Sequence, residues 1–216
     1  MIDFTITACD EYDELKGLIY YLKRFLIDTD NILVFLDGFN TNQNMRDLVI
    51  ESGCKLCEFD CVDFRSKFLF QKSKLTNKIV FGLCADEVPT IPLLYEVRKL
   101  AKADLNGVDV IAVPRMNIFS DIHTLEDKPM YTGDRPPKYL LDEPITQEGW
   151  HCWPDYQVRL WKNLPHITWG ETTHTGIIGY RGMYVFPADA KYAILHVKTI
   201  ARQERILKIY DKIGLG

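Results

Sequence analysis

The sequence lacks the features that mark several large classes of protein. No apolar run approaches the ~20 residues that a membrane-spanning helix needs. Residues 1–6 have neither the basic start nor the apolar stretch of a signal peptide, so we expect a cytoplasmic protein. A formal charge of −4 offers no basic face for nucleic acid. No G-x-G-x-x-G motif follows the first predicted strand, which excludes an NAD-binding module.

The six cysteines also lack the spacing of a complete metal site. Cys54, Cys57 and Cys61 form a C-x2-C-x3-C cluster, a spacing that zinc or an iron–sulfur centre can use. No second Cys pair or His pair accompanies the cluster, which also overlaps an apolar pattern. We therefore favour buried free thiols in a reducing compartment over a metal site.

The chain does contain a regular alternation of strand and helix patterns. Its 216 residues fit one domain, and 47% hydrophobic with 26% charged residues is typical of a globular protein. The alternation predicts an α/β fold with a mainly parallel sheet. The predicted strands are residues 4–8, 31–36, 55–59, 79–84, 109–113 and 191–197, and the predicted helices are residues 14–26, 45–52, 64–75, 90–102 and 199–212.

One long segment, residues 120–149, shows no sustained periodicity and is rich in Pro, Asp, Gly and Tyr. Loops of this length in a compact domain usually serve a function, such as a lid or an acceptor-binding wall. We therefore expect this segment to lie beside the functional site.

Two adjacent carboxylates, Asp86 and Glu87, follow the short apolar strand predicted at 79–84. Ligands of open α/β sheets bind beyond the carboxyl ends of the strands. Carboxylate oxygens there suit Mg²⁺ or Mn²⁺ held together with substrate phosphates. The alternative is that the pair caps the following helix, since acidic residues favour helix N-termini.

Several signals in order resemble those of family 2-like glycosyltransferases with the GT-A fold, of a compact type found in bacteria and large DNA viruses. A first strand runs into Asp10-Glu11 and a helix, and a second strand ends in Asp37-Gly38. The fourth strand ends in Ala85-Asp86-Glu87, and a Pro-Asp-x-Gln-x-Arg-Leu segment begins at Pro154. A late His-x-Lys-Thr begins at His196. The resemblance covers nearly the whole chain and implies a Rossmann-like, mainly parallel sheet flanked by helices.

The resemblance implies a metal and a nucleotide-sugar pocket. Mn²⁺ or Mg²⁺ would bind Asp86 and His196, although Cys84 stands where the family's Asp-x-Asp motif has its first aspartate. Glu87 would support the site. The implied donor-binding residues are Ala8, Asp10, Glu11, Tyr12, Asp37, Arg65, Lys67, Ala85 and Lys198.

Catalysis would centre on Asp155, the implied base that takes the proton of the acceptor hydroxyl. Arg159 lies four residues on, one turn along a helical face, and would keep Asp155 ionised; the alternative is a helix cap with a surface ion pair. Weaker acceptor-side candidates are Glu87, Trp153 and His174, with Trp150 and His151 beside them. For Arg202 and Arg205 we favour a solvated helix face over phosphate binding.

The expected function is transfer of a hexose, with inversion, from a nucleoside-diphosphate sugar, preferably a UDP-sugar, to a hydroxyl of a glycan. Residues 1–113 would bind the donor and residues 114–216 the acceptor, in a single domain that is compatible with a longer protein. One alternative is a catalytically degenerate binding domain, suggested by Cys84. Another is a sugar nucleotidyltransferase, but the acidic, glycine-free segment 9–13 argues against it.

Overall fold

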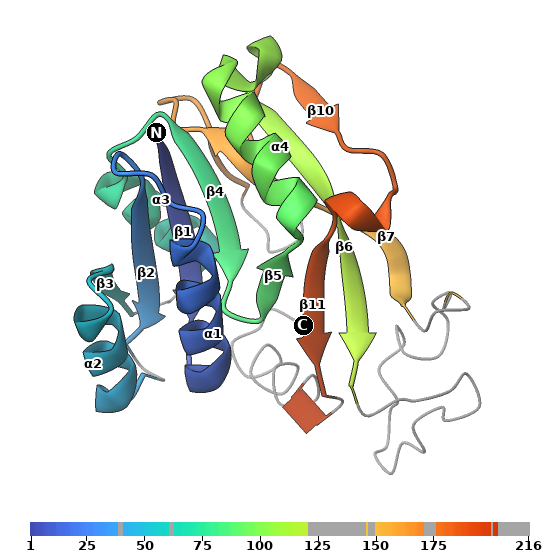
Figure 1. Ribbon diagram of the computed structural model, residues 1–216. Helices are drawn as coiled ribbons and strands as arrows, with labels where there is room; N and C mark the ends of the chain where they lie inside the picture. The colour runs from blue at the N-terminus through green and yellow to red at the C-terminus, as the bar shows by residue number, and fades with distance from the viewer. Residues whose placement is uncertain are drawn as a thin grey trace.

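The computed structural model describes residues 1–38, 41–60, 63–120, 146, 150–170, 176–199 and 201–202, apart from the side chain of Phe64. In this part of the chain a nine-stranded sheet lies between layers of helices, and a two-stranded sheet lies beside it (Figure 1). No helix in these residues is both long and apolar enough to cross a bilayer.

The helices and strands alternate through the first half of the chain. The α-helices are α1 (Tyr12–Lys23), α2 (Gln43–Glu51), α3 (Phe64–Lys74) and α4 (Ile91–Lys102), and the 3-10 helices are η1 (Asp104–Gly107) and η2 (Ala190–Tyr192). The strands are β1 (Ile2–Ala8), β2 (Asn31–Asp37), β3 (Lys55–Phe59), β4 (Ile79–Cys84), β5 (Glu87–Pro89), β6 (Val110–Phe119), β7 (His151–Lys162), β8 (Thr168–Trp169), β9 (Ile177–Ile178), β10 (Met183–Val185) and β11 (Ile194–Lys198).

The large sheet has the strand order β3-β2-β1-β4-β7-β6-β11-β5, and β10 pairs with the first half of β6. Five of its eight pairings are parallel, and the three antiparallel ones involve β7 and β5. The carboxyl ends of β1, β2, β4, β6 and β11 meet at one edge, the lower edge in Figure 1, where β7 begins. This edge is where an open α/β sheet binds its ligands.

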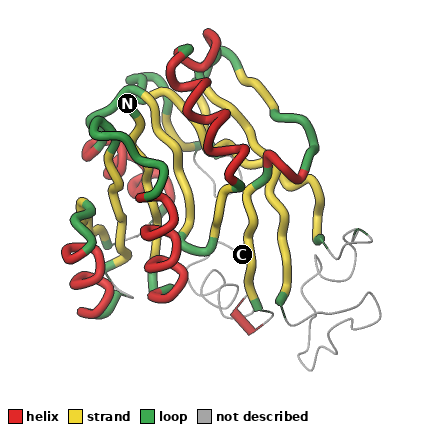
Figure 2. Tube along the Cα trace, viewed as in Figure 1, coloured by secondary structure: helices red, strands yellow, loops and turns green. Residues whose placement is uncertain are grey.

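Helices cover both faces of the sheet. α1, α2 and α4 lie on one face and α3 lies on the other, as Figure 2 shows in red. The first face buries the larger core, in which Phe81 of β4 packs edge-on against Phe4 of β1 at 6.0 Å between ring centroids. On the second face Phe68 of α3 packs against Trp161 of β7. Burial on both faces explains why β2 and β4 contain continuous apolar runs.

The predicted fold class is confirmed, and the elements of the first half lie close to their predicted bounds. β3 and β4 coincide with the predicted ranges. Helix starts carry side-chain caps at Asn42, Asp63 and Thr90, each of which accepts a hydrogen bond from a backbone N–H of the first turn. Gly53 closes α2 with a φ of 66°, a left-handed conformation that glycine adopts without strain.

Three predictions for the second half of the chain need correction. β6 continues to Phe119, six residues past the predicted end, because Arg115 and Asn117 pair with β7 although they are polar. The segment around Asp155 is strand β7 and not a helical face. The late strand begins at Ile194, because residues 190–192 form η2. The predicted helix at 199–212 lies outside the described residues except at its start.

The cysteine cluster does not form a metal site in the described residues. Cys54 packs against the larger core on the α1 face, whereas Cys57 packs with Leu33 and Phe35 in the cluster on the other face. Both are free thiols, and burial raises the pKa of each above its usual value. Cys61 lies outside the described residues. The prediction of buried thiols is therefore confirmed for Cys57, whereas Cys54 is half-buried.

At the opposite edge of the sheet, Asp3 joins β1 to the residues before β4 and to the start of β2, and its removal should lower the free energy of unfolding. Its fully buried carboxylate accepts hydrogen bonds from the backbone of Thr76 and Asn77 at 2.7 and 2.8 Å, and from the side chain of Asn31 at 2.7 Å. Asp3→Ala leaves these donors unpaired, so the free energy of unfolding in urea should fall by about 2–4 kcal/mol. The exposed Asp28→Ala is the control, and an equal loss in both variants would contradict the assignment.

Candidate active site

The acidic pair lies in a tight turn at the carboxyl edge of the sheet. Ala85 and Asp86 connect β4 to the short strand β5, which turns back and pairs antiparallel with β11 so that Glu87 lies opposite His196. The side chain of Thr90, not either carboxylate, caps α4. The alternative interpretation of the pair as a helix cap is therefore wrong.

Asp86 and His196 contact each other directly. His196 Nε2 lies 2.9 Å from Asp86 Oδ2, and His196 Nδ1 lies 2.7 Å from Asn117 Oδ1. Burial acts to raise the pKa of Asp86, but the hydrogen bond and charge of His196, together with Arg202, outweigh it and hold the pKa below its usual value. The two predicted metal-binding residues thus form a pair, anchored from behind by Asn117.

Glu87 is fully buried and points into the protein. Its Oε1 accepts hydrogen bonds from Arg115 Nη1 at 2.9 Å and Arg159 Nη2 at 2.5 Å, and its Oε2 accepts one from the backbone N–H of Cys84 at 2.9 Å. Burial opposes ionisation, yet the two guanidiniums lower the pKa of Glu87 to about 2. The expectation of an acceptor-side role needs correction, because this carboxylate has no exposed surface with which to meet an acceptor.

Arg159 forms its ion pair with Glu87 and not with Asp155. At the position of Arg159 the pairing of β7 with β6 shifts by one residue, so that Arg159 is the extra residue of a β-bulge. Bulges re-aim side chains, and here the guanidinium reaches Glu87. The predicted helical pairing of Arg159 with Asp155 is therefore wrong, since the segment is a strand.

Asp155 is instead held by Arg115 and Asn117, which the sequence did not single out, and by Gln157 of its own motif. Its Oδ2 accepts from Arg115 Nε at 2.9 Å, Arg115 Nη2 at 2.5 Å and Asn117 Nδ2 at 2.9 Å, while Gln157 Nε2 donates to Oδ1 at 2.7 Å. Burial acts to raise the pKa of Asp155, but Arg115 and these hydrogen bonds bring it below its usual value. The side chain keeps 22% of its surface exposed. Asp155 is thus an ionised, fixed and accessible carboxylate, and not a helix cap.

The described donor-side candidates gather at the same edge of the sheet. Ala8 and Asp37 end β1 and β2, and Ala85 donates its N–H to the carbonyl of Thr7 at 2.9 Å. The donor-side candidates after β1 are Asp10, Glu11 and Tyr12, and those at the start of α3, beyond the carboxyl end of β3, are Arg65 and Lys67. Glu11 closes its turn by accepting from the N–H of Cys9 at 2.6 Å. The structure therefore brings these candidates into one region.

Lys198, at the end of β11, lies among the charged groups of the site. Its Nζ lies 5.3 Å from the ring centroid of Phe119. Burial and, after it, the charge of Arg115 lower the pKa of Lys198 to about 8, against the opposing effect of Asp86 and Asp155. Lys198 is therefore a cation close to both carboxylates.

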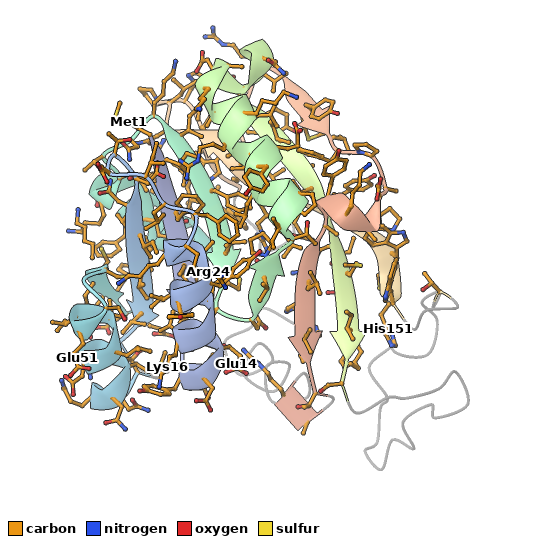
Figure 3. The ribbon with its side chains drawn as sticks, in the orientation of Figure 1. Met1, Glu14, Lys16, Arg24, Glu51 and His151 are labelled. Atoms are coloured by element: carbon orange, nitrogen blue, oxygen red, sulfur yellow. The ribbon has the colours of Figure 1, made fainter. Side chains whose placement is uncertain are left out.

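Arg202 occupies the acidic region between β1 and β11. Its guanidinium donates to Glu11 at 2.7 Å and Glu14 at 2.8 Å and lies 3.4 Å from Asp86. Figure 3 shows Glu14 at the start of α1, on the side that faces the chain after β11. A cavity of about 370 Å³ lies here, lined by Asp10, Glu11, Glu14, Thr199, Ala201 and Arg202. The expected solvated helix face is wrong for Arg202, whose side chain is 10% exposed; Arg205 lies outside the described residues.

The aromatic candidates at the start of β7 differ in how far they are buried. The indole rings of Trp150 and Trp153 pack edge-on at 5.2 Å between centroids, at the start of β7. His151 is buried and packs against the ring of Phe119 at 4.7 Å, so it does not line an open sugar pocket. Trp153 is partly exposed and lies two residues from Asp155. His174 lies outside the described residues.

Comparison with solved structures shows what this arrangement is similar to. The crystal structure of S. aureus TarS covers 97% of this chain with 10% identity and a TM-score of 0.57. TarS residues 1–349 in complex with UDP-GlcNAc covers 91% with 10% identity and a TM-score of 0.54. The chain has the GT-A fold. It spans 39% and 58% of the lengths of those two chains.

A second enzyme of known structure matches only part of the chain. Glucosyl-3-phosphoglycerate synthase from Mycobacterium tuberculosis, in complex with Mn²⁺, UDP and glucosyl-3-phosphoglycerate, covers 54% of this chain and 44% of its own at 14% identity. Its TM-score of 0.41 is too low to support an argument. No protein-family model and no curated protein sequence matches the chain.

Asp86 and His196 fit a small divalent ion on this GT-A fold. Their facing atoms are 2.9 Å apart, close to the ~3 Å expected for two neighbouring ligands bound at ~2.1 Å and a right angle. No group of three or more His, Cys, Asp or Glu side chains with metal-site geometry occurs in the described residues, so the remaining ligands would be phosphate oxygens and water. Burial and Glu87 raise the pKa of the Cys84 thiol to about 12, so it offers no thiolate.

The pairing of Glu87 predicts a specific loss of stability in acid. Because the folded pKa of about 2 lies below the ordinary 4.5, ionised Glu87 stabilises the fold above pH 4.5, and this contribution is lost as the pH falls toward 2. Between about pH 7 and about pH 3 the contribution should fall by about 2 kcal/mol. Over this pH range, the free energy of unfolding in urea should fall by about 2 kcal/mol less in Glu87→Gln than in the wild-type protein. An unchanged dependence would contradict the assignment.

Proposed function

We propose that this protein is a glycosyltransferase that moves a sugar from a nucleoside-diphosphate sugar to an acceptor hydroxyl. The observation that carries the proposal is the hydrogen-bonded chain from Asp86 through His196 and Asn117 to Asp155, at the carboxyl edge of a GT-A sheet. This chain of contacts joins Asp86 and His196, which would bind the metal, to an accessible carboxylate, and that arrangement supports group transfer from a diphosphate.

The donor nucleotide would lie across the carboxyl ends of β1 and β2. Asp37 would accept hydrogen bonds from its base or ribose, and the turn at Ala8, Asp10, Glu11 and Tyr12 would form the rest of the pocket, with Ala85 as its floor. The cavity beside Glu11 and Arg202 supports this placement. A UDP-sugar is the favoured donor, because TarS of the same fold is described in complex with UDP-GlcNAc.

A divalent ion, Mn²⁺ or Mg²⁺, would be held by Asp86 and His196 and would neutralise the charge of the diphosphate. Cationic side chains supply the rest of this stabilisation where charge develops on the leaving group. Arg202 lies 3.4 Å from Asp86, and Lys198 is close enough for the charge of Asp86 to act on its pKa. Arg65 and Lys67, in the first turn of α3, are further candidates. The chain thus carries its own counterions for a nucleoside diphosphate.

Asp155 would act as the base that receives the proton of the acceptor hydroxyl. Its Oδ2 already accepts three N–H groups, whereas Oδ1 accepts one from Gln157 and keeps a lone pair for the acceptor. The lowered pKa keeps the carboxylate ionised at neutral pH. Arg159 would act only indirectly, through Glu87 and Arg115. Displacement by an acceptor opposite the diphosphate would invert the anomeric carbon.

We propose a hexose as the transferred sugar and a glycan hydroxyl as the acceptor, with Trp153 and His174 on the acceptor side and no role for nucleic acid. Residues 1–113 would form the donor half and residues 114–216 the acceptor half of one domain, in the cytoplasm. A degenerate binding domain is the alternative that Cys84 favours, and it would bind the donor without turnover.

Donor binding can be tested by thermal shift. A panel of nucleoside diphosphates and nucleotide sugars is added with and without Mn²⁺, and the melting temperature is measured. A true donor binds the folded state alone and should add about 2.7 kcal/mol at ~100 times its Kd, most strongly with Mn²⁺ present. If no nucleoside diphosphate raises the melting temperature even with Mn²⁺, the proposed function fails.

Two substitutions separate the proposed roles. Asp155→Asn should reduce UDP release from the best donor at least ~100-fold, as expected for a lost general base, while the Kd of the donor changes little. Asp86→Ala should weaken donor binding in Mn²⁺ and lose the difference between Mn²⁺ and a chelator. Calorimetry measures binding and a coupled assay measures UDP. Equal effects of both changes on binding would contradict the two assignments.

A further inference from the structure

Asn117 of β6 lies between the two halves of the candidate site, and its partners fix the orientation of its amide. The nitrogen lies 2.9 Å from Asp155 Oδ2 and 3.3 Å from the carbonyl oxygen of His151, and the oxygen lies 2.7 Å from His196 Nδ1. A reversed amide would point its oxygen at two other oxygens. The nitrogen must therefore face Asp155, and the oxygen must face His196.

The orientation of the Asn117 amide determines which ring nitrogen of His196 carries a proton toward Asn117. An amide oxygen only accepts, so His196 Nδ1 must carry the proton that joins the two side chains. A histidine that binds a metal usually donates its second ring N–H in this way, which fixes the tautomer and directs the other nitrogen at the ion. Here that other nitrogen, Nε2, lies 2.9 Å from Asp86 Oδ2.

The same side chain fixes Asp155 through its other end. The Asn117 nitrogen and two nitrogens of Arg115 all donate to Oδ2, so the carboxylate cannot rotate without breaking three hydrogen bonds. Oδ1 is thereby directed away from this cluster, and it accepts a hydrogen bond from Gln157 Nε2 at 2.7 Å. Asn117 is 7% exposed, so water does not substitute for it easily.

We infer that Asn117 is a positioning residue that sets both the metal-binding nitrogen of His196 and the orientation of the base Asp155. The inference rests on the proposed function, because it assigns Asn117 to the metal and the base of that reaction. Asn117 touches neither substrate nor metal. Its two ends act on different steps, since the oxygen governs metal binding and the nitrogen governs proton transfer.

Two substitutions of Asn117 separate these ends. Asn117→Leu removes both contacts, so the Kd for Mn²⁺ in the presence of UDP should rise roughly tenfold to hundredfold, with UDP release also reduced. Asn117→Asp keeps an oxygen for His196 but loses the N–H toward Asp155, so Mn²⁺ affinity should equal or exceed that of wild type while UDP release falls at least ~tenfold. Electron paramagnetic resonance of free Mn²⁺ measures the affinity without turnover.

Gln157→Leu is the matched control, because Gln157 also donates an amide N–H to Asp155 but does not contact His196 in the described residues. It should leave the Kd for Mn²⁺ unchanged. Melting temperatures establish that each variant is folded, and Asn117→Ser, with the same expected loss, replaces Asn117→Leu where that variant does not fold. A purely structural role would lower stability without separating Mn²⁺ affinity from UDP release.

The outcomes distinguish the inference from the proposed function. If wild type binds Mn²⁺ with UDP, His196→Ala loses it, and Asn117→Leu and Asn117→Ser keep it, the inference alone is overturned. Parallel loss of Mn²⁺ affinity and UDP release in Asn117→Asp also overturns the inference. If wild type binds no Mn²⁺ with UDP, the metal site of the proposed function fails, and the inference fails with it.

Discussion

The site depends on the burial of one carboxylate between two guanidiniums. Glu87 has no exposed surface, and a buried charge of this kind is tolerated only when it is paired and hydrogen-bonded. Its partners Arg115 and Arg159 come from β6 and β7. The three-residue strand β5 pairs with β11 along its backbone, and this ion pair adds a second link, from β5 to β6 and β7. Asp86, immediately before Glu87, is placed by the same pairing.

The contacts that begin at Glu87 form a closed ring. Glu87 binds Arg115, Arg115 binds Asp155, Asn117 joins Asp155 to His196, and His196 binds Asp86, the neighbour of Glu87 in the chain. Hydrogen bonds to ionised groups are stronger than neutral ones, and linked networks reinforce each other. The side chains of the proposed metal site and of the proposed base are therefore parts of one hydrogen-bonded ring.

The sequence predicts the first half of the fold well because its signals are local. Apolar runs, helix caps and Gly53 each act within a few residues, and they place β3 and β4 correctly. The second half depends on contacts between distant residues. Asp155 and Arg159 are four apart, a spacing that fits one helical face as well as one strand face, and only pairing with β6 decides for the strand. Arg115 and Asn117 are polar and follow an apolar run, so the pattern suggests a loop where the structure continues the strand. Of the candidate site, motif order led to the prediction that Asp86 and His196 act together, and the two are in contact, whereas nothing in the sequence pointed to Asn117.

The position of Arg202 sets one positive charge against several negative ones in the acidic pocket. Its guanidinium donates to Glu11 and Glu14 and lies 3.4 Å from Asp86. Because the three carboxylates outnumber the guanidinium, a diphosphate that enters this pocket without a cation would be repelled. Under the proposed function, a diphosphate that arrives together with a divalent ion is close to neutral and would avoid this repulsion. Discrimination of this kind works by penalising the wrong partner more than by attracting the right one. The pocket would thus favour the nucleotide with its metal over the nucleotide alone.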